Sequence, residues 1–143
     1  MKKSIFYRLF GIGSMPAEIR DLISREGILA SEEGIKGWFI AKNAKGPGKR
    51  FIHKRRGFVG YLALTSERLI LYFMGRRQIN IAFNNPGFNK IRVNILEPGT
   101  LSVSFESSEF LDGWEGVFEY RIKTGKAQQF YDILVSRGAL ESG

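Results

Sequence analysis

Cysteine is absent from the sequence, and histidine occurs only once, at position 53. Without cysteine the chain forms no disulfide and offers no thiolate ligand to a metal. The single imidazole of His53 lies among lysines and arginines, which makes it a poor metal ligand and leaves no partner for a histidine-dependent nucleophile. We therefore expect no metal site, no cofactor and no enzymatic activity.

Other sources of catalytic chemistry are weak as well. The stretch KGPGKR lacks the full pattern of a nucleotide-binding P-loop, because no serine or threonine follows its lysine. The acids that could supply a carboxylate pair or a cation site are Glu106, Glu109, Asp112, Glu115 and Glu119. Glu115 and Glu119, however, alternate with apolar residues, so we expect them on the solvated outer face of a strand. The sequence favours a binding module over a catalyst.

Long hydrophobic runs are missing too. The run at residues 69–74 has six residues, whereas a membrane-spanning helix needs about 18 or more. We therefore expect no transmembrane segment. The chain has 143 residues, of which 43% are hydrophobic, and this is enough for one domain with an ordinary core.

Acidic residues are scarce in the middle of the chain, where basic residues are concentrated. Residues 36–92 contain thirteen lysines and arginines and one acid, Glu67, whereas residues 97–119 contain six acids and no base. The net charge of the chain is +8. Such a basic block is either a solvated face or a surface for an anionic partner. The absence of cysteine fits a reducing compartment, so we expect a cytoplasmic protein that is peripheral at the inner membrane surface.

Two helices are predicted, one near each end of the chain. Ser14 and Pro16 are suited to the start of a short helix over about residues 15–26, which Gly27 would end. Near the other end, Thr124 can cap a second helix. Apolar residues at i, i+3, i+4 and i+7 give this helix one apolar stripe, which consists of Ala127, Phe130, Tyr131 and Leu134.

Between the helices the hydrophobic period changes from 3.6 to 2, which predicts strands. Seven strands are expected, at residues 35–43, 58–65, 68–74, 78–83, 90–96, 101–106 and 114–122. Residues 44–49, AKGPGK, have the composition of a flexible loop. Because most connections are short, we expect a mainly β (α+β) fold in which seven antiparallel strands form a partly open barrel with the second helix at its open corner. The domain is expected to cover residues 28–143, after an N-terminal segment at residues 1–27 that holds the short helix.

The stretch GYLALTSERLILY, residues 60–72, contains glycine, alternating apolar residues, threonine, two polar turn residues, then arginine, leucine and further apolar residues. This pattern resembles a hairpin of the pleckstrin-homology-like (PH-like) superfold, in particular of its GRAM and bacterial PH-like branches. The stretch TGKAQQFYDILV, residues 124–135, looks like the C-terminal helix of those branches. The resemblance covers residues 28–138 and implies a PH-like barrel that serves as a binding domain.

In members of this superfold that bind phosphoinositides, the headgroup lies at the open end of the barrel, against the loop between the first two strands. Carried over by position, the residues for an anionic ligand are Lys42, Lys45, Lys49 and Arg50 in that loop, Lys54, Arg55 and Arg56 just beyond it, and Arg76 and Arg77 in the loop between the third and fourth strands. The loop SSEFLDG should lie at the same end, and its Glu109 and Asp112 depart from a simple phosphate pocket. We therefore expect an attachment that follows surface charge and ignores headgroup stereochemistry.

Several partners remain open for the basic block. An anionic phospholipid surface or an acidic protein would be held weakly, since each lysine or arginine near an anionic leaflet contributes at most about 1 kcal/mol. In a homo-oligomeric scaffold, the basic face of one subunit would meet the acidic face of the next. Nucleic acid ranks third: Phe51, Phe58 and Tyr61 among the cations could stack on bases, but the apolar pattern assigns Phe58 and Tyr61 to packing.

The N-terminal segment carries its own candidate contacts with a membrane. Lys2 and Lys3 precede apolar residues that share one helical face, among them Phe6 and Phe10. Arg8 interrupts this short apolar stretch, so it is not a convincing signal peptide. Either Lys2, Lys3, Phe6 and Phe10 contact the lipid interface, or the segment packs on its own domain or on a neighbouring subunit.

Overall fold

The computed structural model describes residues 17–73 and 78–141, with residues 49, 51, 54, 58, 73 and 78 described by their backbone only. These ranges contain two α-helices, α2 (Ala17–Glu26) and α3 (Ala127–Ser136). They also contain the strands β1 (Ile28–Gly46), β2 (Lys49–Thr65), β3 (Arg68–Phe73), β4 (Gln78–Ala82), β5 (Arg92–Glu97), β6 (Thr100–Glu106), β7 (Glu115–Lys123) and β8 (Leu140–Glu141). Two short 3-10 helices, η1 (Phe88–Lys90) and η2 (Ser107–Glu109), lie in the connections from β4 to β5 and from β6 to β7.

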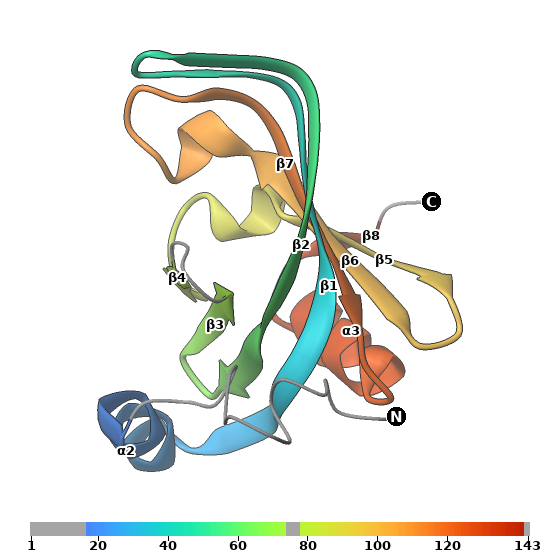
Figure 1. The fold of residues 1–143 in the computed structure, drawn as a ribbon. Coiled ribbons are helices and arrows are strands. Elements are labelled where there is room, and N and C mark those ends of the chain that lie inside the picture. The colour runs from blue at the N-terminus through green and yellow to red at the C-terminus, as the bar shows by residue number, and fades with distance from the viewer. Residues whose placement is uncertain (1–16, 74–77, 142–143) are drawn as a thin grey trace.

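All of these strands belong to one sheet, in the order β4-β3-β2-β1-β7-β6-β5-β8. Consecutive strands are antiparallel neighbours within β1–β4 and within β5–β7, and the two groups join where β1 pairs with β7. The sheet curls into an open half-barrel, and α3 packs against β5, β6 and β1 (Figure 1). The predicted mainly β class is therefore confirmed.

The prediction of seven strands is too low, because residues 17–73 and 78–141 already contain eight. The seven predicted strands are present as β1–β7, and β8 follows α3 and pairs in parallel with β5. The amide of Leu140 donates to the carbonyl oxygen of Ile91 at 2.8 Å, and Ala139 beside it is buried. Because β8 has two residues and is fixed by the docking of the chain after α3, no hydrophobic period could mark it.

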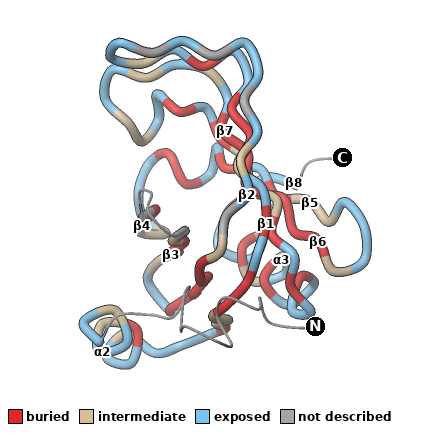
Figure 2. Tube along the Cα trace, viewed as in Figure 1, coloured by how far each residue is buried: buried red, intermediate tan, exposed pale blue. Residues whose placement is uncertain are grey.

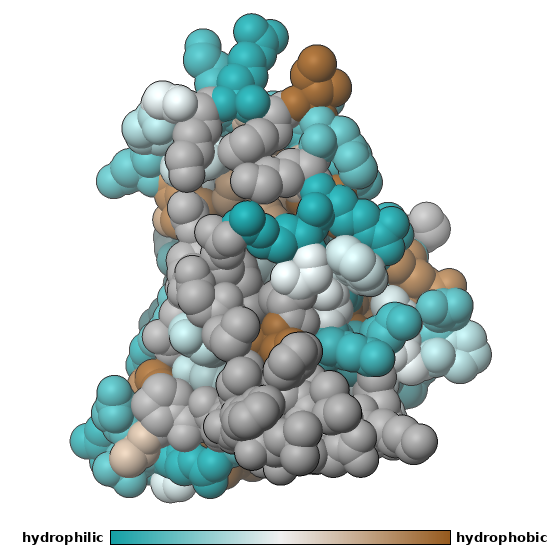
Figure 3. Space-filling view, viewed as in Figure 1, coloured by the Kyte–Doolittle hydropathy of each residue, from teal (hydrophilic) through white to brown (hydrophobic). Residues whose placement is uncertain are grey.

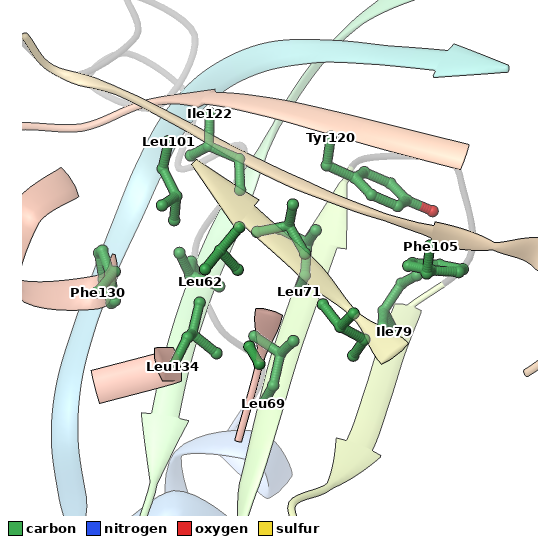
Figure 4. Close-up of a cluster of buried hydrophobic side chains, with 14 of the residues drawn as sticks. Leu62, Leu69, Leu71, Ile79, Leu101, Phe105, Tyr120, Ile122, Phe130 and Leu134 are labelled. Carbon is green, nitrogen blue, oxygen red and sulfur yellow. The ribbon is translucent and has the colours of Figure 1, made fainter. Parts of the chain in front are cut away.

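The main hydrophobic core lies between the curled sheet and α3. Side chains alternate between the faces of each strand, so both halves of the sheet point every second residue toward this core. Figure 4 labels ten of its members: Leu62, Leu69, Leu71, Ile79, Leu101, Phe105, Tyr120, Ile122, Phe130 and Leu134. Phe130 and Leu134 of α3 are fully buried, which confirms the predicted stripe, and Tyr131 is half-buried at its edge.

α2 covers the opposite face of β2 and β3. Ile23 of this helix packs with Tyr61, Ala63 and Ile70 in a second, smaller buried cluster. The end of the helix is fastened to the sheet by a bidentate ion pair, in which Nε of Arg68 donates to Oε1 of Glu26 at 2.9 Å and Nη2 of Arg68 lies 2.6 Å from Oε2. The predicted helix is thus confirmed from residue 17 onward, and its predicted first residues, 15 and 16, lie outside the described residues.

β1 and β2 continue beyond the half-barrel as a long two-stranded ribbon, which arches over the top of the view in Figure 1. Their pairing continues as far as Gly46 opposite Lys49, so only Pro47 and Gly48 form the turn. The prediction of a flexible loop over residues 44–49 is therefore wrong. A two-stranded hairpin alone is marginally stable, but β7 pairs with the other side of β1 as far as Lys45 and supplies a third strand. Figure 2 shows that exposed residues predominate along the outer part of the ribbon, whereas buried ones are concentrated in the half-barrel.

Candidate anion-binding site

Most of the basic residues predicted to bind an anion lie on this ribbon. We call residues 39–46 of β1 together with residues 49–56 of β2 the basic ribbon. The cations on it whose side chains are described are Lys42, Lys45, Arg50, Arg55 and Arg56. All of them are exposed except Arg56, which is half-buried.

The strand register brings basic and acidic residues into two neighbouring rows. Lys45 of β1 stands opposite Arg50 of β2 on one side and opposite Glu115 of β7 on the other. The second row runs from Glu106 of β6 across β7 to Lys42 of β1. Side chains directly opposite one another on antiparallel strands share a face, with Cβ atoms about 4.5–5.5 Å apart. Cations from β1 and β2 therefore lie beside carboxylates from β6 and β7.

These rows line an open groove of about 680 Å³, which we call the mixed-charge groove. Its lining side chains are basic (Lys42, Lys45 and Arg50), acidic (Glu106 and Glu115) and apolar (Ile52 and Val117), among others. Sites for small molecules typically have volumes of about 300–1,000 Å³. The groove is therefore large enough for a ligand the size of a phospholipid headgroup.

A bulge in β1 shapes this groove. Asn43 has a positive φ of 50°, and the register between β1 and β7 shifts between Lys42 and Lys45. These two lysines are three residues apart, so in a regular strand they would point to opposite faces, whereas here both line the groove. Across the bulge, Gly116 has a φ of 101°, and a Cβ atom on it would lie 2.4 Å from the carbonyl oxygen of Asn43. The bulge therefore requires glycine at position 116.

Glu119 forms the centre of a charge cluster beside the groove. Only 7% of this residue is exposed, so the prediction that it lies on a solvated face is wrong. Its carboxylate accepts hydrogen bonds from Oγ of Ser102 at 2.7 Å and from Nε of Arg121 at 3.0 Å, and it lies 3.3 Å from Nζ of Lys42. Burial alone raises the pKa of Glu119, but the hydrogen bonds from Arg121 and Ser102 and the charges of Arg121 and Lys42 outweigh it and lower the pKa. Glu119 is therefore an anion at neutral pH, and it holds Lys42 in place.

Neither Arg55 nor Arg56 lines the groove, and as neighbours on β2 they point to opposite faces of the ribbon. The guanidinium carbon of Arg55 lies 4.2 Å from the ring centroid of Trp38. That ring lies over Gly57, where a Cβ atom would be 3.5 Å from it, and Trp38 remains 38% exposed. Arg56 stands opposite Phe39, which packs on the main core. The predicted set of cations is thus divided between two faces of the ribbon.

An apolar side chain projects from the charged end of the ribbon. Ile52 is 81% exposed, and Val117, which also lines the groove, is 37% exposed. Figure 3 shows a mostly hydrophilic surface at this end of the molecule, with a hydrophobic group that projects from it. Sequence reasoning missed Ile52 and Trp38, since only the folded structure shows that both stay exposed and outside the core.

The acidic residues of segment 97–119 do not form a separate face. The pairing of β7 with β1 places Glu115 beside Lys45. Glu109 forms an ion pair with Lys90, whose Nζ lies 3.1 Å from a carboxylate oxygen. The separation of charge that is evident along the sequence is therefore largely lost in space.

The structure leaves the other predicted contacts unplaced. The backbones of Lys49 and Lys54 belong to β2, and their side chains are not described. The remaining predicted residues lie outside the described residues: Arg76, Arg77, Lys2, Lys3, Phe6 and Phe10.

Within residues 17–73 and 78–141, no group of three or more His, Asp or Glu side chains is arranged to hold a metal ion. His53 is exposed and stands opposite Lys42 in the ribbon. Neither helix of the described part of the chain has the length and the apolar character needed to cross a membrane.

No protein-family model matches the chain, and a search among curated proteins finds no match either.

Proposed function

We propose that the protein is a non-catalytic binding module whose basic ribbon attaches weakly and reversibly to an anionic phospholipid surface. The observation that carries this proposal is that Lys42, Lys45 and Arg50 line one groove on a projecting ribbon, beside the exposed Ile52. Each cation near an anionic leaflet contributes up to about 1 kcal/mol, and an apolar side chain adds affinity when it enters the interface. Several such contacts together give reversible attachment.

Repulsion between two neighbouring cations of the ribbon supports an anionic ligand. Lys45 and Arg50 are directly opposite each other on neighbouring strands. Like charges in this position destabilise a sheet by up to about 1 kcal/mol. An anion bound between the two side chains would relieve this repulsion.

We also propose that the domain is PH-like. The strands β1–β7 and helix α3 fit the arrangement that the resemblance implies, with antiparallel strands in a partly open barrel and a terminal helix at its open corner. In that superfold, the connection between the first two strands lies at the ligand-binding end. In this chain the corresponding hairpin is the basic ribbon.

A scaffold or homo-oligomer is the second candidate, and one feature of β2 favours it. Among the described strands, none pairs with residues 49–59 of β2 on the side away from β1. An open strand edge is a template for pairing with another chain. Lysine and arginine side chains on an edge oppose such pairing, which is why this candidate ranks below membrane attachment.

Co-sedimentation with vesicles tests the proposal. The protein should bind vesicles that contain phosphatidylglycerol and not vesicles of phosphatidylcholine alone, and binding should weaken between about 50 and 300 mM salt as screening increases. A variant with Lys42→Gln, Lys45→Gln and Arg50→Gln should bind at least about tenfold more weakly, because three contacts of up to about 1 kcal/mol each are lost.

The matched control replaces three exposed cations elsewhere, Arg25, Arg92 and Lys123, with glutamine. This variant has the same net charge as the ribbon variant and should keep most of the binding. Equal losses in both variants would show that net charge and not the ribbon drives attachment. A stable oligomer in light scattering, combined with no binding to any vesicle, would replace the membrane proposal with the scaffold.

A further inference from the structure

We propose that the mixed-charge groove selects the headgroup of an aminophospholipid, a lipid such as phosphatidylserine in which a primary ammonium is linked to the phosphate through two carbon atoms. The phosphate would lie against Lys45 and Arg50, and the ammonium against Glu106 and Glu115. This inference rests on the proposed attachment to membranes and adds a chemical selectivity to it.

The carboxylates are the feature that charge-driven attachment leaves unexplained. Glu106 and Glu115 are exposed and line the same groove as the cations. On a surface that only attracts anionic lipid, acids at this place would weaken binding. A ligand that carries both charges turns the same two acids into favourable contacts.

The strands set the spacing between the two kinds of charge. Lys45 and Glu115 are opposite each other on β1 and β7, and neighbouring strands lie about 4.8 Å apart. Two carbon atoms separate the phosphate ester oxygen from the ammonium, so the headgroup spans a comparable distance. One end of it can therefore face β1 and β2 while the other faces β6 and β7.

Glu106 is fixed in the orientation that this contact needs. Its Oε1 accepts the backbone N–H of Gly116 at 2.7 Å, at the bulge that shapes the groove. The bond holds one carboxylate oxygen against β7 and keeps the group beside the groove. The acidic side of the groove is thus preorganised, which lowers the entropic cost of binding.

Apolar side chains favour a lipid over a soluble compound with the same headgroup. Ile52 and Val117 line the groove and are exposed. A free phosphate ester would leave them in water, whereas a headgroup in a bilayer would bring them to the apolar interface. Soluble phosphoserine should therefore not displace the protein from vesicles at concentrations where the lipid itself binds.

Vesicles that contain equal fractions of phosphatidylserine or phosphatidylglycerol test the selectivity, since both lipids carry one net negative charge and only the first has an ammonium. The protein should bind phosphatidylserine about two- to fivefold more tightly, the effect expected of one exposed ion pair. Glu106→Gln with Glu115→Gln should reduce this ratio to about one, while binding to phosphatidylglycerol becomes stronger because two repelling charges are gone.

The control is Asp21→Asn with Asp132→Asn, which removes the same charge from exposed positions on α2 and α3. It should strengthen binding to both lipids and leave their ratio unchanged. If the double variant does not fold, Glu115→Gln alone serves in its place, because it keeps the hydrogen bond between Glu106 and Gly116. This single variant should lower in part the preference for phosphatidylserine over phosphatidylglycerol.

Equal binding of the unmodified protein to the two lipids would overturn the aminophospholipid assignment and leave charge-driven attachment intact. Displacement by soluble phosphoserine would overturn the assignment to a lipid. Failure to bind either kind of vesicle would refute the proposed function itself, so the two failures are distinguishable.

Discussion

Nζ of Lys42 lies 3.3 Å from a carboxylate oxygen of Glu119, so this ion pair joins the basic segment of the chain to the acidic one. The Glu119 side chain is 9% exposed, whereas that of Lys42 is 47% exposed. The pair therefore connects the protein interior to its surface. The positive charge of Lys42 compensates the negative charge of the buried Glu119 carboxylate, and the ion pair holds this lysine of the groove in a defined position.

Glu119→Gln should lower the free energy of unfolding by about 1–3 kcal/mol at neutral pH, because hydrogen bonds to a charged group are lost in a largely buried site. The folded protein holds the pKa of Glu119 below its usual value, so the carboxylate stabilises the fold above the pKa of the unfolded chain. That contribution disappears as the pH falls through the lowered pKa of the folded state. Urea unfolding of both proteins at neutral pH and at about pH 3 should show the difference shrinking in acid; an equal difference at both would contradict the assignment.

Gly116→Ala should destabilise the fold by more than about 2 kcal/mol, because a strained φ and a backbone clash add together. The control is Gly48→Ala, at a φ of 70° in the ribbon turn, where a Cβ atom would meet no atom within 4 Å. This variant carries the conformational strain without the clash and should lose only about 1 kcal/mol. Thermal unfolding followed by circular dichroism measures both, and equal losses would mean that β7 can move away from the bulge.

Phe130→Ala should cost about 3–5 kcal/mol, because it removes a fully buried ring from the contact between α3 and the sheet. The neighbouring exposed Gln129 provides the comparison, since Gln129→Ala should change stability by less than about 0.5 kcal/mol. Denaturant unfolding curves measure both changes. A loss below about 1 kcal/mol for Phe130→Ala would show that α3 is not part of the core.

Burial raises the pKa of Tyr61 to about 12, with further contributions from the nearby Tyr72, Glu18 and Glu33. Because the folded state keeps this phenol neutral, its contribution to stability is complete below pH about 10 and is lost as the pH rises toward the folded pKa. Over this alkaline range, the free energy of unfolding of the unmodified protein should therefore fall more than that of the Tyr61→Phe variant. Unfolding at a series of pH values checks this, and parallel curves for the two proteins would show that Tyr61 titrates normally.

The sequence predicted those elements whose apolar residues repeat locally. Apolar residues of α3 and of β6 face the core at the regular spacing of a helix and of a strand, so both patterns are visible in a window of ten residues. The start of β1 was predicted seven residues too late, at residue 35 and not at Ile28. Bulges interrupt the register between Ile28 and Ala30 and between Glu33 and Ile35, and they break the period of two there.

The β2 half of the basic ribbon, residues 49–56, could not be predicted because it is held by strand pairing and its described side chains are exposed or half-buried. Residues 49–56 are rich in charge and alternate poorly, so their composition indicates a loop. The sequence grouped Lys42, Lys45 and Arg50 around one connection between strands, but it could not place Glu106 and Glu115 beside them. That juxtaposition depends on the register of β7 against β1, which involves residues about 70 positions apart in the sequence.

A single strand, β1, runs for 19 residues through both the half-barrel and the ribbon. The ribbon pairs at residues 39–42 are also flanked by β7, so they cannot open without disturbing the strand around which the core is built. Their amides should consequently exchange hydrogen with solvent in the same slow, cooperative step as those of the core. A ligand in the groove would then raise the unfolding temperature of the entire domain and not merely order an appendage, since its binding energy is linked to the global folding equilibrium.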